Sequence, residues 1–492
     1  MWGNPVPQSF LFLLLLPLLL LSCLNPAMGQ QQLMCGRASE ESLRELMMDP
    51  ESQNNVSDNE SCTSGVRTKV TRPHTVSITE FGAVGNGKFL NTHAFENAIF
   101  YLRTFADKGG AQLYIPPGQW LTGSISLISH LTLYLDRGAT ILASQDPKTF
   151  PVIDGLPSYG RGCELPGGRH SSVIHGENLA DIVITGENGT IDGQGWVWWD
   201  MVHNRTLDYT RGHLVELINS TNILISNLTF VNSPFWTIHP VYCSNLTIRN
   251  LTIWAPGDSP NTDGIVPDSC TNVCIEDCSI SSGGDALSIK SGWDEYGMAY
   301  KRPSSNIWIQ RVVSSAPSGA GFAIGSEMSG GVSNIKVEDV VILNTKSGIQ
   351  MKTTAGRGGY IVNVSISTIE MHNTEKAIVF TGFSGKHPDD NWDRKAYPLV
   401  EQIWIKNVVG ENIMQAGELL GLQEAPFRDI CLINIALDVI SGWPYWNCSE
   451  VVGSSSYVLP KPCPELQDSV LSSSKRWGHW DHGWIEGFSL DA

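Results

Sequence analysis

A short pattern repeated along the chain decides its fold, and it reads Asn222-Ile-Leu-Ile at its first copy. An asparagine is followed by an apolar residue, any residue and a second apolar residue. The pattern returns as Asn245-Leu-Thr-Ile, Asn272-Val-Cys-Ile, Asn306-Ile-Trp-Ile, Asn334-Ile-Lys-Val and Asn363-Val-Ser-Ile, and later as Gln402-Ile-Trp-Ile and Cys431-Leu-Ile-Asn. The first six copies begin 23 to 34 residues apart. Steps of this length predict a solenoid, in which stacked units bury the apolar side that a single unit leaves exposed.

The repeated units favour strands over helices. Each unit holds two or three short apolar runs separated by Gly, Asn, Asp or Ser, which is typical of strands joined by turns. No long amphipathic helix separates the runs, and the units are too short for the four-stranded blade of a propeller. We therefore expect an all-β chain folded as a parallel β-helix, with the asparagines in turns, where they tolerate a left-handed backbone. An ordinary β-sandwich is the alternative.

The chain divides into four predicted parts. Residues 1–29 are interpreted as a secretory signal, because the apolar run Phe10–Leu21 is too short to span a bilayer and Ala27-Met-Gly29 offers a cleavage site. A signal anchor that stays in the membrane is the alternative. The other predicted parts are an N-terminal extension (30–75), the β-helix (76–459) and a C-terminal tail (460–492). After cleavage the chain is expected to be secreted, outside the cell and free of the membrane.

Cysteines and glycosylation motifs fit a secreted chain. Removal of the signal leaves ten of the eleven cysteines, which can form up to five disulfides in an oxidising compartment, with Cys35 and Cys62 as one candidate pair. Cys270, Cys274 and Cys278 recur every four residues, but they belong to an alternating strand pattern, so we predict no metal site. Ten Asn-x-Ser/Thr motifs indicate a glycoprotein. They start at Asn55, Asn59, Asn188, Asn204, Asn219, Asn227, Asn245, Asn250, Asn363 and Asn447.

The charge and composition of the chain exclude several classes of protein. The chain carries 32 Lys and Arg against 49 Asp and Glu, a formal charge of -17, and so acidic a surface is a poor match for nucleic acid. A hydrophobic content of 41% excludes a disordered chain. The stretch from Gly283 to Arg357 differs from the rest, with eight Lys and Arg against six Asp and Glu. We expect this stretch to hold a polyanionic partner locally.

Several motifs carry a resemblance to a known family. They read Ile78-Thr-Glu-Phe-Gly-Ala-Val-Gly-Asn-Gly-Lys88, Gly189-Thr-Ile-Asp-Gly-Gln-Gly195, Asn261-Thr-Asp-Gly264, Gly325-Ser-Glu-Met-Ser-Gly-Gly331 and Gly356-Arg-Gly-Gly-Tyr360. With them the chain resembles the plant polygalacturonase-like branch of glycoside hydrolase family 28, over about residues 76 to 465. The resemblance implies a single-stranded right-handed parallel β-helix that hydrolyses pectic polysaccharide of the cell wall with inversion. It also implies a monomer that needs no cofactor.

Inverting hydrolysis needs an acid that protonates the leaving oxygen and a base that activates water, with the two carboxyl groups about 6.5 to 9.5 Å apart. Stacked coils place equivalent residues about 4.8 Å apart, so residues one or two coils apart can span this gap. The resemblance assigns a water-activating role to Asp263, and it aligns Asp285 with the second Asp of the family's Gly-Asp-Asp motif. Gly284 then stands where the first Asp, the usual general acid, belongs.

Two further positions depart from the family's pattern. Ala320 replaces the histidine of a Gly-His-Gly motif, and Gln350 replaces the arginine of an Arg-Ile-Lys motif. Lys352 remains and can meet a substrate carboxylate as a point charge, whereas Gln350 lacks the charged planar fork of arginine. The residues predicted to bind substrate are therefore Lys352, Gln350, Asn261 and Lys290.

These departures leave two functions open. In the first, the chain is a hydrolase of galacturonan that recruits another acid; Glu327 is the best candidate, and Asp285 would serve if its pKa were raised. In the second, the chain binds pectin without cutting it, because losing a general acid typically lowers the rate about 10²- to 10⁴-fold. A rhamnogalacturonan-type hydrolase, which would depend less on the missing arginine, is the alternative enzyme. A calcium-dependent lyase fits less well, because no acidic calcium cluster stands out.

Overall fold

The computed structural model describes residues 71–441 and 444–467. Several predictions lie outside the described residues: the signal (1–29), most of the extension and of the tail, the Cys35–Cys62 pair, and the glycosylation motifs at Asn55 and Asn59. Within the described part, no helix is long and apolar enough to cross a membrane.

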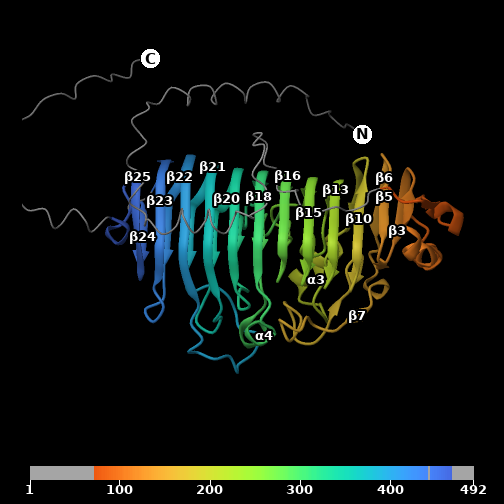
Figure 1. The fold of residues 1–492 in the computed structure, drawn as a ribbon, viewed down its shortest axis with the longest axis horizontal. Coiled ribbons are helices and arrows are strands. Elements are labelled where there is room, and N and C mark those ends of the chain that lie inside the picture. The colour runs from red at the N-terminus through yellow and green to blue at the C-terminus, as the bar shows by residue number, and fades with distance from the viewer. Residues whose placement is uncertain (1–70, 442–443, 468–492) are drawn as a thin grey trace, which may run out of the picture. The chain divides into compact units, whose positions relative to one another are not determined.

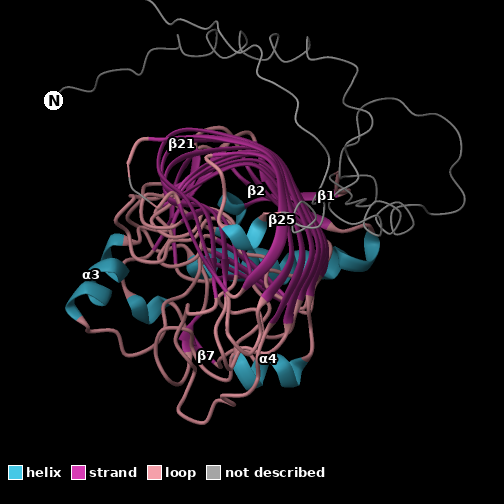
Figure 2. Ribbon diagram, turned by 90° about the vertical axis from the view of Figure 1, so that its left-hand side faces the viewer, coloured by secondary structure: helices cyan, strands magenta, loops and turns pink. Residues whose placement is uncertain are grey.

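The strands form a parallel β-helix, which confirms the predicted fold class. One sheet joins 19 strands, and four further strands form a second sheet in the order β14-β12-β9-β4. The pairs within both sheets are parallel, and β7 pairs with β8 in antiparallel fashion. Figure 1 shows the long strands side by side in chain order, and Figure 2 shows the same stack from one end.

The strands lengthen toward the C-terminal half of the chain. Those of the first half are β1 (His74–Ser77), β2 (Ala111–Ile115), β3 (Gly118–Thr122), β4 (Ile125–Ser126), β5 (Leu131–Leu135), β6 (Ala139–Ala143), β7 (Val152–Ile153), β8 (Arg169–His170), β9 (Ile174–Glu177), β10 (Ala180–Gly186), β11 (Gly189–Asp192), β12 (Val215–Ile218), β13 (Thr221–Val231) and β14 (Ile238–Val241). Those of the second half are β15 (Ser244–Trp254), β16 (Thr271–Ser281), β17 (Ser288–Ile289), β18 (Ser304–Ser315), β19 (Ala320–Ile324), β20 (Val332–Lys352), β21 (Tyr360–Thr381), β22 (Leu399–Leu420), β23 (Phe427–Val439), β24 (Trp446–Ser449) and β25 (Val451–Leu459).

Helices are few and lie at the margins of the solenoid. They are α2 (Thr92–Leu102), α3 (Trp196–Asn204), α4 (Asp294–Tyr300) and the short 3-10 helices η5 (Ile78–Phe81), η6 (Arg103–Lys108), η7 (Pro147–Thr149) and η8 (Pro464–Leu466). Helix α2 packs against the first coils, because Phe95, Ile99 and Leu102 are buried on one of its faces. Helices α3 and α4 lie among the long connections on one side of the coils (Figure 2).

The two apolar positions of the repeated pattern form two buried columns in the core. The first column consists of Ile223, Leu246, Val273, Ile307, Ile335, Val364, Ile403 and Ile430, paired in register from coil to coil. The copy predicted at Gln402 is confirmed by this register. The copy predicted at Cys431 is wrong: Ile430 and Leu432 are the column members, so that copy begins at Asp429. Side chains alternate between faces along a strand, so the core accepts only one frame.

The asparagines that open the pattern lie in left-handed turns, as predicted. Their φ angles are 56° to 58°, and from the second copy onward each side-chain amide donates to the amide oxygen of the asparagine one coil earlier, at 2.7 to 3.2 Å. The members of this ladder are Asn222, Asn245, Asn272, Asn306, Asn334 and Asn363. Asparagine recurs because it combines a donor, an acceptor and tolerance of a positive φ in one short side chain.

The described cysteines do not all pair, so the upper limit of five disulfides is not reached. Cys448 and Cys463 form a disulfide, and Cys274 and Cys431 each take part in a disulfide as well. The free thiols among the described residues are Cys163, Cys243, Cys270 and Cys278. Of the cysteines spaced by four residues, Cys270 directly precedes β16, and Cys274 and Cys278 lie within it. Their spacing therefore reflects the strand and not a cluster of three thiols.

Candidate active site

A cavity of about 550 Å³ lies where connections and strand ends of successive coils meet. The fold brings all seven residues predicted for the site to its lining: Asn261, Asp263, Asp285, Lys290, Glu327, Gln350 and Lys352. Four aromatic residues that the motifs did not indicate also line it: Tyr159, Phe235, Trp236 and Trp293. Phe235 and Trp236 come from the preceding coil, Tyr159 comes from the connection between β7 and β8, and Trp293 follows Lys290 by three residues.

Asp263 and Asp285 lie on neighbouring coils. The backbone N–H of Gly264 donates to the carbonyl oxygen of Asp285 at 2.9 Å, and the N–H of Asp285 donates to Oδ1 of Asp263 at 3.2 Å. Both side chains are buried. Neighbouring coils are about 4.8 Å apart, so adjacent coils present both carboxyl groups to the same cavity.

Gly284 explains the position of the Asp263 side chain. A Cβ atom on residue 284 would lie 1.9 Å from Oδ1 of Asp263 and 3.0 Å from its Cγ. Atoms cannot approach that closely, so the carboxyl group of Asp263 occupies the space in which a side chain on residue 284 would begin. In the place where the motif lacks an aspartate, a carboxyl group from the preceding coil is present.

The two carboxyl groups differ in proton affinity. Burial and the charge of Asp285 raise the pKa of Asp263 to about 7. Burial also acts to raise the pKa of Asp285, but Lys352 and Lys290 outweigh it and hold that pKa below its usual 3.8. Nζ of Lys352 lies 2.5 Å from Oδ2 of Asp285, and the N–H of Ala320 donates to Oδ1 at 2.9 Å. At mildly acidic pH the first group is therefore protonated and the second is ionised.

Glu327 lies in the cavity but does not suit the predicted role of general acid. Nζ of Lys290 lies 2.7 Å from its Oε2. Burial acts to raise the pKa of Glu327, but Lys290, then Arg357, outweigh this effect and hold the pKa far below its usual range. Glu327 is thus ionised, and of the two aspartates Asp263 has the raised pKa and Asp285 the lowered one.

The predicted cationic residues are already engaged within the protein. Lys352 pairs with Asp285, and Lys290 pairs with Glu327. Lys346, which the motifs did not indicate, lines the same cavity and forms no ion pair with a described residue. It is therefore the lysine available to a substrate carboxylate without breaking an internal pair.

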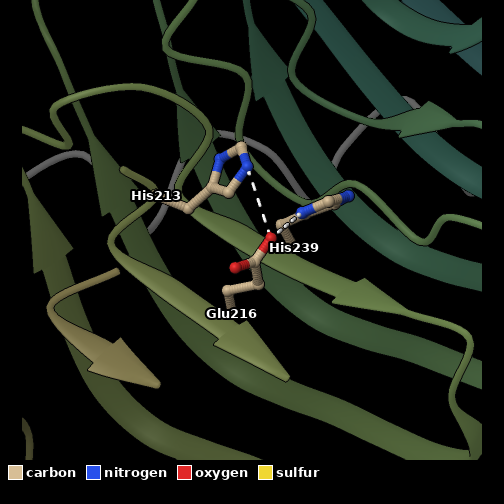
Figure 3. Close-up of side chains that lie close together, drawn as sticks. All are labelled: His213, Glu216 and His239. Atoms are coloured by element: carbon tan, nitrogen blue, oxygen red, sulfur yellow. Dashed lines mark hydrogen bonds and ion pairs between the residues drawn. The ribbon is translucent and has the colours of Figure 1, made fainter. Parts of the chain in front are cut away.

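A buried polar cluster lies on the coils before the two aspartates, and sequence reasoning missed it. His213, Glu216 and His239 converge there, with Oε1 of Glu216 lying 3.0 Å from Nδ1 of His239 and 3.6 Å from Nε2 of His213 (Figure 3). Nε2 of His239 lies 3.5 Å from Oδ2 of Asp268. The 23-residue step from Glu216 to His239 equals the shortest step of the repeat, so the repeat could have indicated this pair.

The three residues of the cluster could offer metal ligands. Their contacts are those of a network of ion pairs. Nη1 of Arg169 lies 2.5 Å from Oε2 of Glu216, so a cation already neutralises this carboxylate. Burial acts to lower the pKa of His239, but the carboxylate of Asp268, 3.5 Å away, and that of Glu216, which is hydrogen-bonded to the ring, outweigh it and raise that pKa. A second positive ion beside a buried arginine and a histidine that tends to protonate would be repelled.

Comparison with known proteins identifies the family. The model of glycosyl hydrolases family 28 matches residues 164–457. A protein named "Probable polygalacturonase" from Vitis vinifera is 49% identical over 399 residues, which cover 81% of each chain. The structure of an exopolygalacturonase from Thermotoga maritima is 27% identical, covers 80% of this chain and 93% of its own, and has a TM-score of 0.70. The polygalacturonase of Erwinia carotovora shares the fold at 24% identity and a TM-score of 0.63, over 80% of this chain and all of its own. This chain belongs to glycosyl hydrolases family 28.

Proposed function

We propose that this chain hydrolyses the galacturonan of pectin outside the cell, with Asp263 as general acid and Asp285 as base. Membership of family 28 and the polygalacturonase name of the 49% identical relative support the substrate class. The observation that carries the proposal is the split in proton affinity between two stacked carboxyl groups in one cavity. Catalysis by an acid and a base at the same pH requires such a split.

In this mechanism Asp263 protonates the glycosidic oxygen as the bond to the leaving sugar breaks. Asp285, ionised and held by Lys352 and the N–H of Ala320, takes a proton from the attacking water. The roles assigned by the resemblance are thereby changed, because Asp263 moves from the water side to the acid side. Its carboxyl group is suited to this role because it occupies the space next to Gly284.

The stereochemical course is proposed to be inversion, as the resemblance implies. In an inverting mechanism the base activates a water on the face of the sugar opposite the leaving oxygen. Proton NMR of the first product formed distinguishes the outcomes, because inversion and retention release opposite anomers. Release of the retained anomer would contradict the proposed course.

The substrate carboxylate is proposed to meet Lys346 and Gln350. Lys346 lines the cavity without an internal ion pair, and Gln350 offers amide donors without charge. A single flexible ammonium holds a carboxylate less tightly than an arginine fork does. Binding of galacturonan is therefore expected to be weak and to decline with salt.

A pectin-binding chain without activity is the second candidate, and the replacement of three motif residues by Gly284, Ala320 and Gln350 favours it. A rhamnogalacturonan-type hydrolase is the alternative enzyme. The deciding experiment measures reducing ends released by the purified glycosylated chain from polygalacturonate and from rhamnogalacturonan. Binding of either polymer without release of reducing ends would support the inactive chain and overturn the proposed function.

The pH dependence tests the assigned roles. Activity requires protonated Asp263 and ionised Asp285, so kcat/KM on polygalacturonate should be level between the two pKa values and should fall as the pH rises through about 7. Asp263→Asn should lower the rate about 10²- to 10⁴-fold. Asp258→Asn is the matched control, because Asp258 lines the same cavity but is exposed. Equal losses in both variants would contradict the acid role of Asp263.

A further inference from the structure

The cavity ends abruptly on the side of the earlier coils. Phe235 and Trp236 are the last coil residues that line it on that side. The coil before them is adjacent, because the N–H of Leu214 donates to the carbonyl oxygen of Trp236 at 3.1 Å. No described residue of that earlier coil lines the cavity. A groove for the middle of a polymer would continue across this coil, and this one does not.

A buried ion pair occupies the place where such a groove would continue. Arg211 is completely buried, and its Nε lies 2.9 Å from Oε2 of Glu164. Its Nη1 donates to the carbonyl oxygens of Pro234 at 2.7 Å and Pro260 at 3.0 Å, and its guanidinium carbon lies 4.7 Å from the centre of the Phe235 ring. Breaking a buried pair of this kind leaves an uncompensated charge, so the pair resists displacement. We call this pair, Glu164 and Arg211, the stop.

The connection between β7 and β8, residues 154–168, closes a second side. It contributes Glu164 to the stop, and it also runs along the solenoid toward later coils. The N–H of Trp293 donates to the carbonyl oxygen of Ser158 at 2.8 Å, and Nη1 of Arg161 donates to the carbonyl oxygen of Pro388 at 2.6 Å. A single connection thus joins coils that are more than 200 residues apart in sequence.

We call the connection 154–168 the wall. The segment around Pro388, to which Arg161 of the wall donates, is itself held by several contacts. Nε1 of Trp293 and Nη2 of Arg357 each donate to the carbonyl oxygen of Lys386 at 2.9 Å. Arg357 pairs with Asp294, and both side chains are completely buried. His387 lies 2.6 Å from the same carboxyl group of Asp294. The segment that receives Arg161 is therefore anchored, and the wall does not depend on one hydrogen bond.

We propose that the site takes the end of a galacturonan chain and not its interior, so that short products leave from chain ends. This inference rests on the proposed function for its substrate. The terminal sugar meets Glu164, which the buried Arg211 holds in place from behind, and the rest of the chain leaves on the open side of the cavity, past Lys346. A polymer bound through its middle would have to pass through the connection 154–168.

The product profile of polygalacturonate digestion tests the proposal. The expected result is that monomer or dimer is the main product from the first minutes, while the viscosity of the solution falls slowly. Mixed oligomers with a rapid fall in viscosity would overturn the proposal while leaving the hydrolase intact. Release of no reducing ends would overturn the proposed function instead, and a binding measurement then tests the shape of the site.

Calorimetric titration with galacturonan of several mean lengths supplies that measurement. If the site takes chain ends, the amount of protein bound by a given mass of galacturonan should be proportional to the number of chain ends in the sample. If it follows total sugar instead, the proposal is wrong whether or not the chain is active. This readout needs no catalysis, so the two failures remain distinguishable.

A variant of the wall gives an independent test. Arg161→Ala removes the bond to Pro388 and should raise the ratio of mixed oligomers to monomer several-fold. Arg137→Ala is the matched control, because Arg137 is exposed, lies outside the cavity lining and makes only a 4.0 Å contact with Glu187. An unchanged product ratio in Arg161→Ala, together with a length-independent binding per sugar, would overturn the role of the wall.

Discussion

Replacing Gly284 by alanine is expected to disable the site by moving the carboxyl group of Asp263. The new Cβ atom would lie 1.9 Å from Oδ1 of Asp263, whereas ordinary contacts begin at 3.4 Å. The oxygen must therefore move by about 1.5 Å. It would lose the hydrogen bond from the N–H of Asp285, now 3.2 Å long. A misplacement of about 1 Å can lower a rate about 10²-fold, so we expect a loss of at least this order in kcat/KM.

The assay is release of reducing ends from polygalacturonate at a pH below 7, with thermal unfolding measured in parallel. Gly410→Ala is the matched control: its Cβ would lie 2.7 Å from Cδ2 of Leu437, so it also forces a side chain to move, but Gly410 does not line the cavity. Both variants should lower the unfolding temperature to a similar extent. Only Gly284→Ala should lose most of its activity.

The variant Gly284→Asp distinguishes a site in which Asp263 is the general acid from a site that lacks a general acid. An aspartate at residue 284 displaces the carboxyl group of Asp263 but brings its own, so its activity should lie above that of Gly284→Ala. If Gly284→Ala keeps full activity and Gly284→Asp exceeds the natural chain, then the acid position is vacant and Asp263 does not fill it. That pair of results would refute the assignment.

Three further predictions concern charge and stability. Lys352→Met removes the ammonium beside Asp285, so the pKa of Asp285 should rise and the acidic limb of the pH–activity profile should shift to higher pH. Asn306→Ala should destabilise the chain by about 1 to 2 kcal/mol in urea unfolding, because alanine disfavours a φ of 56°; Asn306→Gly, which keeps that conformation accessible, should lose less. Replacing Cys448 and Cys463 by serine opens a loop of 15 residues and should lower stability by about 3 kcal/mol, whereas serine at Cys163, a free cysteine that is not fully buried, should lower it less.

The burial of the site also explains why its two carboxyl groups can differ so much. In a low-dielectric cavity each charge acts over longer distances than in water. Asp285 has a lysine in contact, whereas the charges of Lys290 and Lys352 do not outweigh burial and the neighbouring carboxylate at Asp263. The first is therefore stabilised as an anion and the second as a neutral acid.

Sequence reasoning was most successful for the fold, and the residues that it selected for the site line one cavity. In a solenoid each coil contacts its neighbours, so positions that touch recur at a readable step, and the columns through Ile223 and Ile225 follow from the pattern alone. The motif at Asn261 indicated the family for the same reason: its residues are adjacent in sequence and stay adjacent in the cavity. The last copy begins at Asp429 and not at Cys431, as the sequence had suggested. The four residues from Ile430 to Ile433 are all apolar, so the sequence alone did not show which of them face the core.

The sequence by itself determined that this chain is a β-helix of family 28 and which carboxyl groups face the cavity. Only the tertiary structure decided that the pKa of Asp263 is raised and that of Asp285 lowered, because the pKa of Asp285 depends on Lys352, 67 residues away in the chain. It also decided that the carboxyl group of Asp263 occupies the space beside Gly284, and that Arg161 bonds to Pro388 along the wall of the cavity. Burial, charge and closure arise between coils and connections, and no single stretch of sequence contains them.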